Sequence, residues 1–180
     1  MTAGMIAAVT VIVCLVACVA LVAAELRDWP IGRAIFKLIA SSAFVLVAVQ
    51  VDATASPYGR MILAALALGW LGDVFLLSRR NRLFLLGIAS FLVSHIVFAT
   101  AFAHRPLGEP ALIVGFAAMS CVGLCVLLWL WGHLSRFFRI AVTAYVAAIV
   151  AMFAFAIAAS AASGSWMLAA AALAFAASDI

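Results

Sequence analysis

The chain consists largely of apolar runs that are long enough to cross a lipid bilayer. A helix needs about 20 consecutive apolar residues to span the hydrocarbon core, and several runs approach that length. Soluble helices carry polar residues on every turn, whereas these runs do not. With 71% hydrophobic and 9% charged residues and a mean hydropathy of +1.38, the chain cannot cover a soluble domain with polar side chains. The sequence therefore predicts an all-α, polytopic bundle of transmembrane helices.

Prolines and charged residues divide the chain into about seven segments. All four prolines fall between apolar runs, where they separate helices because proline lacks a backbone donor and disfavours helix in the preceding residue. The predicted segments are 4–24, 33–51, 59–78, 83–103, 110–131, 137–159 and 165–180. Short connections make them antiparallel neighbours in a single transmembrane domain over residues 1–180. The last segment stops about four residues short of a full crossing, so we expect the sequence to be truncated at its C-terminus.

Positive charge is distributed unevenly over the connections. The second and fourth connections carry only Arg60 and Arg105. The other eight basic residues lie on the first, third and fifth connections: Arg27, Arg33, Lys37, Arg79, Arg80, Arg82, Arg136 and Arg139. Because cytoplasmic loops are enriched in Lys and Arg, we expect odd-numbered connections in the cytoplasm and the N-terminus outside, in a bacterial plasma membrane. The charges form separate clusters and not one stripe, so the net charge of +4 does not indicate nucleic-acid binding.

Among the acidic residues and histidines, Asp73, His95 and Asp179 are predicted to lie at membrane depth, whereas the others flank the membrane spans. A charged side chain at the centre of a bilayer costs about 2.5–3.5 kcal/mol on insertion scales, so such residues usually face the bundle interior and serve a function. The alternative is that they only join helices by hydrogen bonds. At about 1.5 Å rise per residue, Asp73 lies roughly 9 Å from the cytoplasmic end of its segment, and Asp179 also reaches the cytoplasmic half.

Other polar side chains are predicted at a similar depth. Tyr145 lies about 9–12 Å into the sixth segment from the same side, Lys37 lies one turn into the second, and His95 is nearer the centre. Gly72, next to Asp73, permits close approach of another helix or of a ligand. We therefore predict one polar layer inside the bundle, contributed by helices that run in different directions.

These residues carry a resemblance to a known family. The central block resembles the signature of the YhhN-like membrane proteins, the lysoplasmalogenase family, at Gly72-Asp73, Arg80-Asn81-Arg82-Leu83-Phe84, Gly87, Phe91, Ser94-His95 and Phe102. Lys37, Tyr145 and Ser178-Asp179 also agree with it. The chain departs from the family at Leu38, where proline is common, and at Phe98, where an aromatic hydroxyl is frequent. Members of the family have about eight helices.

The resemblance implies hydrolysis of the vinyl ether bond of lysoplasmalogens, which releases a fatty aldehyde and a glycerophospho head group. The reaction begins with protonation of the alkene carbon, and water then attacks the resulting oxocarbenium ion. Burial and a second carboxylate nearby both favour the neutral form of a carboxyl group. Asp73 and Asp179 are therefore expected to divide the roles of acid and base, with Asp73 favoured as the acid.

The remaining site residues receive supporting roles. His95 is expected to act with the catalytic pair, and His95 or Tyr145 would orient the water or a carboxylate. Lys37, with Arg80 or Arg82, would hold the substrate phosphate at the cytoplasmic interface, and Gly72 would lie against the substrate.

The sequence contains no zinc motif, glycine-rich phosphate loop or nucleophile elbow. We therefore expect acid–base catalysis with no metal and no cofactor. The expected partners are a lipid substrate and the bilayer, and the oligomeric state is left open. Two other functions stay open. One is a small proton-coupled transporter, in which buried Asp and His relay ions, although no inverted repeat or broken helix pair supports it. The other is a lipid-binding helix bundle without catalysis.

Overall fold

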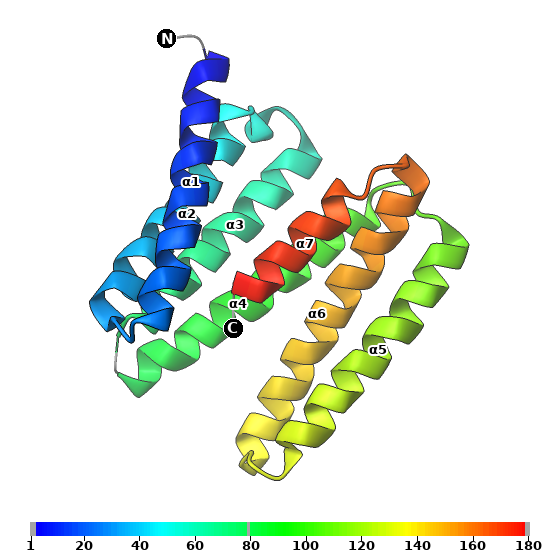
Figure 1. The fold of residues 1–180 in the computed structure, drawn as a ribbon. Coiled ribbons are helices and arrows are strands. Elements are labelled where there is room, and N and C mark those ends of the chain that lie inside the picture. The colour runs from blue at the N-terminus through cyan, green and yellow to red at the C-terminus, as the bar shows by residue number, and fades with distance from the viewer. Residues whose placement is uncertain (1–2, 79, 179–180) are drawn as a thin grey trace. The chain divides into compact units, whose positions relative to one another are not determined.

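The computed structural model describes residues 3–78 and 80–178, and within these ranges its regular elements are helical. They are α1 (Ala3–Leu26), α2 (Pro30–Gln50), the 3-10 turn η1 (Ala53–Ala55), α3 (Pro57–Leu76), α4 (Asn81–Ala103), α5 (Glu109–Trp131), α6 (Arg136–Ser163) and α7 (Met167–Ser178), as Figure 1 traces. Helices α1 to α6 are long and apolar enough to cross a bilayer. The prediction of an all-α integral membrane protein is confirmed.

The helix ends follow from local chemistry. Pro30 and Pro57 open α2 and α3, because the fixed φ of proline suits a first helical turn that needs no amide donor. The Ser56 hydroxyl caps α3 by accepting a hydrogen bond from the Gly59 amide at 2.9 Å. Gly164 ends α6 with a φ of +69°, a left-handed conformation that favours glycine. The predicted start of α2 at 33 was three residues too late, and the predicted end of α6 at 159 was four residues too early.

The chain forms two compact units, Met1–Ser94 (unit 1) and His95–Ile180 (unit 2). The boundary lies within α4, so the first part of that helix belongs to unit 1 and the remainder to unit 2. The single transmembrane domain over residues 1–180 stays a prediction.

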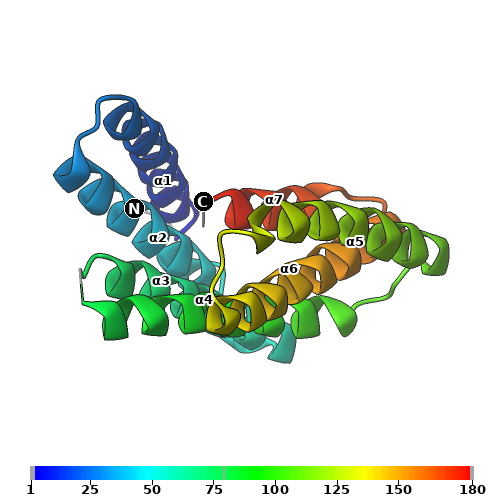
Figure 2. The same ribbon diagram turned by 90° about the horizontal axis from the view of Figure 1, so that it is seen from below.

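In unit 1, α2 packs against both α1 and α3 (Figures 1 and 2). The buried thiol of Cys14 on α1 contacts the carbonyl of buried Ala40 on α2 at 3.8 Å. At the C-terminal end of α2, the Gln50 side-chain amide donates to the Thr10 hydroxyl at 3.0 Å. Small side chains and a few polar bonds thus hold α1 to α2, as is usual where lipid supplies no hydrophobic drive between helices.

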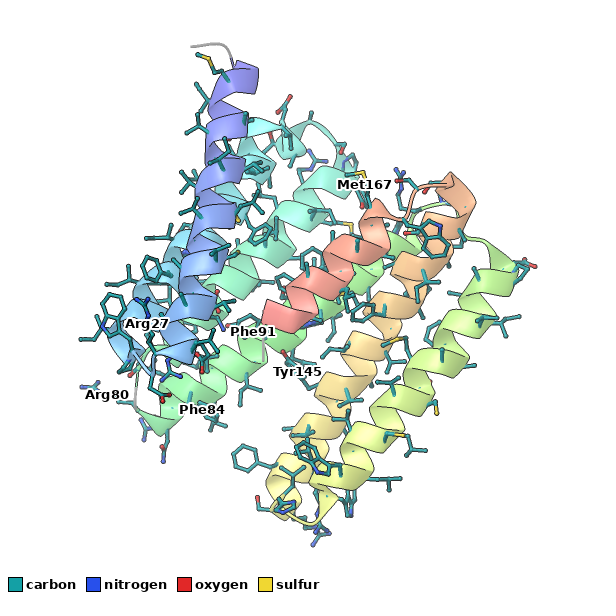
Figure 3. The ribbon with its side chains drawn as sticks, viewed as in Figure 1. Arg27, Arg80, Phe84, Phe91, Tyr145 and Met167 are labelled. Atoms are coloured by element: carbon teal, nitrogen blue, oxygen red, sulfur yellow. The ribbon has the colours of Figure 1, made fainter. Side chains whose placement is uncertain are left out.

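Two connections that carry basic residues lie at the same end of unit 1. Figure 3 shows Arg27, from the α1–α2 connection, at the end where Arg80 and Phe84 mark the α3–α4 connection. At this end Arg33 also forms an ion pair with Glu25, with 2.8 Å between Nη1 and Oε1. The first and third connections, both predicted to be cytoplasmic, therefore lie together, while the orientation itself stays a prediction.

In unit 2, α5 and α6 run antiparallel and side by side, and α7 packs on α6 (Figures 1 and 2). Glycines allow the close approach of α5: Gly115 faces Ala154, and a Cβ at Gly123 would lie 2.8 Å from the side chain of Val146. The buried Ser160 hydroxyl accepts a hydrogen bond from the Ala169 amide at 3.0 Å. This bond ties the start of α7 to the end of α6.

Candidate active site

Asp73 on α3 is buried, with 7% of its surface exposed, and it is paired with a cation. The Nζ atom of Lys37, on α2, lies 3.4 Å from Oδ1 of Asp73. This oxygen accepts no hydrogen bond from the described residues, so the ion pair is the contact that compensates its burial. Pairing lowers the cost of holding a carboxylate inside a membrane bundle. The structure thus brings together two of the predicted site residues from different helices of unit 1.

Two serines on α2 follow Lys37 by about one turn. Ser41 lies one turn after Lys37 on the same helix face. Its side chain also interacts with Asp73, and its hydroxyl donates to the Lys37 carbonyl at 3.0 Å. The next residue, Ser42, accepts a hydrogen bond from Nε1 of Trp70 on α3 at 2.9 Å. This bond fixes α2 against α3 within a turn of Asp73.

Gly72 is the contact point between α3 and α4. A Cβ at this position would lie 2.6 Å from the ring of buried Phe91, so glycine leaves the room that this ring occupies. A Cβ at Gly87 would lie 2.8 Å from Leu76 and 3.2 Å from the Gly72 carbonyl. Nearby, the buried Ser94 hydroxyl donates to the Ala65 carbonyl at 2.7 Å. Gly72 therefore has a packing role beside Asp73, and its contact with substrate stays a prediction.

In unit 2, His95 is fully buried, with 0% exposed, among aromatic rings. Tyr145 of α6 meets it edge-on, with 5.2 Å between the ring centroids, and Figure 3 marks Tyr145 along α6. Phe175 of α7 lies 5.4 Å from His95 and 4.8 Å from Phe98, again between centroids. Two predicted site residues, His95 and Tyr145, are thus in contact. A protonated imidazole or another cation at this position would be stabilised by such rings.

The two arginines predicted to bind phosphate are accessible. Arg80 immediately precedes α4 and Arg82 is its second residue, and both side chains are exposed. They lie at the end of unit 1 where Arg27 also lies (Figure 3). Asp179, the predicted base, lies outside the described residues.

Two residues of these clusters were missed by sequence reasoning. The spacing of Ser41, four residues after Lys37, could have indicated it, because such residues share a helix face. No local pattern indicated Phe175, which lies in a run of alanines on α7.

Comparison with known proteins settles the family. The YhhN family model matches residues 32–180, which include both polar clusters and most of α2 to α7. The chain belongs to the YhhN family. Helix α1 lies outside the matched range.

Curated relatives of this YhhN-family chain include two animal proteins. It is 34% identical to lysoplasmalogenase TMEM86A of Bos taurus over 93 residues, covering 52% of this chain and 37% of the relative. It is 36% identical to lysoplasmalogenase TMEM86A of Homo sapiens over 95 residues, covering 53% and 38%. The chain thus matches less than two-fifths of the length of these relatives. No solved structure matches it.

Proposed function

We propose that this protein is a membrane-embedded hydrolase that cleaves the vinyl ether bond of lysoplasmalogen-type lysolipids. The observation that carries the proposal is the pair of buried Asp73 and half-buried Lys37 on helices long and apolar enough to span a membrane. A packing role alone does not explain a carboxylate and an ammonium in this position, because apolar side chains of similar volume would be as stable or more so. Membership of the YhhN family and the names of the relatives support this substrate class.

The chemistry needs an acid, a place for a cation and a base. Asp73, as a carboxylic acid, transfers its proton to the alkene carbon that is not bonded to oxygen, and the electron pair of the double bond forms the new C–H bond. Water adds to the oxocarbenium carbon and gives its proton to a base, for which we propose Asp179. The resulting hemiacetal then breaks its bond to the glycerol oxygen, and its hydroxyl proton is transferred to that oxygen. The products are a fatty aldehyde and a glycerophospho head group.

The other predicted residues fit supporting roles. The exposed Arg80 and Arg82 lie where a head group at the membrane surface is accessible, and arginine binds phosphate through two parallel hydrogen bonds. His95, in contact with Tyr145, is proposed to orient the attacking water. Catalysis on this account uses side chains of the protein alone.

The test is release of aldehyde by the purified protein in detergent or nanodiscs. The protein is offered a lysoplasmalogen and, in parallel, the analogue with a saturated ether. We expect aldehyde from the vinyl ether alone, and Asp73→Asn should lower kcat/KM by about 10²–10⁴-fold, the usual contribution of a general acid. Absence of aldehyde from the wild type, or full activity of Asp73→Asn, would reject the proposal. Proton uptake into liposomes that depends on Asp73 would favour a transporter instead.

A further inference from the structure

The Lys37–Asp73 pair is asymmetric in its accessibility. The Asp73 side chain is 9% exposed and that of Lys37 is 29% exposed. The more exposed ammonium group is therefore the member of the pair that a proton from outside the bundle reaches more readily.

The pair also conflicts with a phosphate-binding role for Lys37. An ammonium group 3.4 Å from a carboxylate has its charge largely compensated, which weakens its attraction for a phosphate. A pair of this kind has two forms, an ammonium with a carboxylate or an amine with a carboxylic acid. Desolvation penalises the charged form while Coulomb attraction favours it, and transfer of one proton between the two groups converts one form into the other.

We propose that Lys37 acts through Asp73 as its proton reservoir, loading the carboxyl group with the proton that it gives to the substrate. This inference rests on the proposed vinyl ether hydrolysis and assigns Lys37 a role other than phosphate binding.

The proton balance closes over one turnover. The Lys37 ammonium passes a proton to the Asp73 carboxylate, which leaves an amine and a carboxylic acid. The acid protonates the alkene carbon and becomes a carboxylate again. Water adds to the oxocarbenium carbon, and the proton it loses returns to the Lys37 amine. Collapse of the hemiacetal moves its hydroxyl proton to the glycerol oxygen. The sum is one vinyl ether and one water giving one aldehyde and one alcohol.

Substitution of Lys37 by arginine distinguishes a proton reservoir from a phosphate-binding residue. Arginine keeps the positive charge and binds phosphate at least as well as lysine, but it does not release a proton at accessible pH. We expect Lys37→Arg to lower kcat about 100-fold or more with KM within about threefold of the wild type. Lys37→Met should behave similarly. The matched control is Arg60→Lys, an exposed arginine on α3, which should keep wild-type activity.

A chemically modified variant makes the same distinction if the arginine side chain does not fit at position 37. Lys37→Cys is alkylated with bromoethylamine, which restores a titratable amine, or with bromoethyl-trimethylammonium, which restores only a fixed charge. The wild type is alkylated in parallel, and mass spectrometry establishes complete modification. Activity restored by the amine alone supports the proton reservoir.

Three outcomes overturn parts of the account. Aldehyde release by Lys37→Arg at the wild-type rate overturns the reservoir and leaves the hydrolase standing. Rescue of Lys37→Cys by both reagents, or by neither, also overturns it. A wild type that releases no aldehyde removes the proposed function, and the reservoir with it.

Discussion

Gly72 and Asp73 are neighbours on α3 with different constraints. The carboxyl group of Asp73 pairs with α2, while the missing side chain of Gly72 makes room for Phe91 of α4. The two residues together hold α3 between its two neighbours in unit 1. A change at Gly72 therefore alters the support of the acid without touching its chemistry.

Replacement of Gly72 by alanine tests this constraint. The new Cβ would lie 2.6 Å from the Phe91 ring, and overpacking of this kind typically costs about 1–3 kcal/mol. Gly72→Ala should lower the thermal midpoint of the detergent-solubilised protein, and Gly72→Ala with Phe91→Leu should recover part of the loss. Gly132→Ala is the control, because a Cβ added at Gly132 would meet no atom within 4 Å. An unchanged midpoint for Gly72→Ala would contradict the packing described for α3 and α4.

At the scale of whole helices, the connection from α6 to α7 depends on one buried hydroxyl. Ser160 is 0% exposed and accepts from the Ala169 amide, which otherwise has no partner within the first turn of α7. Ser160→Ala should therefore speed hydrogen exchange in the first turn of α7, while exchange in the middle of α5 stays constant. Equal exchange of the α7 amides in both proteins would show that the bond does not hold this helix.

The helices were predictable from the sequence and their mutual contacts were not. Pro30, Pro57 and the charged connections placed the helix starts to within a few residues, because these signals act locally. Binding of phosphate by Lys37 stays a prediction, but the contact between its ammonium and Asp73 was not predicted. That contact depends on how α2 is rotated about its axis against α3. Nothing in a run of apolar residues specifies that rotation.

In the candidate site, too, the depth of residues along their helices was predictable and their contacts were not. Depth along each helix predicted that Asp73, Lys37 and Tyr145 lie in one polar layer, with His95 nearer the centre of the bundle. Phe175 could not be found in this way, because one phenylalanine among alanines gives no signal until α7 folds back on α6. The predicted layer that joins both clusters with Asp179 stays a prediction.

For the whole molecule, the basic connections predict its orientation. The first and third connections lie together at one end of unit 1, and the positive-inside rule assigns that end to the cytoplasm. In a cysteine-free background, a cysteine at Thr54 should react with a membrane-impermeant maleimide added to intact cells, and one at Asn81 should react only after permeabilisation. The reverse labelling would place the N-terminus inside and move the phosphate-binding arginines to the outer face.

The central claim is that the substrate is activated by protonation at carbon. The most direct measurement is turnover of a lysoplasmalogen in D₂O, with the aldehyde reduced at once to its alcohol so that later exchange is prevented, followed by mass spectrometry. The account predicts one deuterium per molecule, on the carbon next to the former carbonyl carbon. An aldehyde formed without deuterium at that carbon would contradict it, because the vinyl ether would then have been cleaved without proton transfer from an acid such as Asp73.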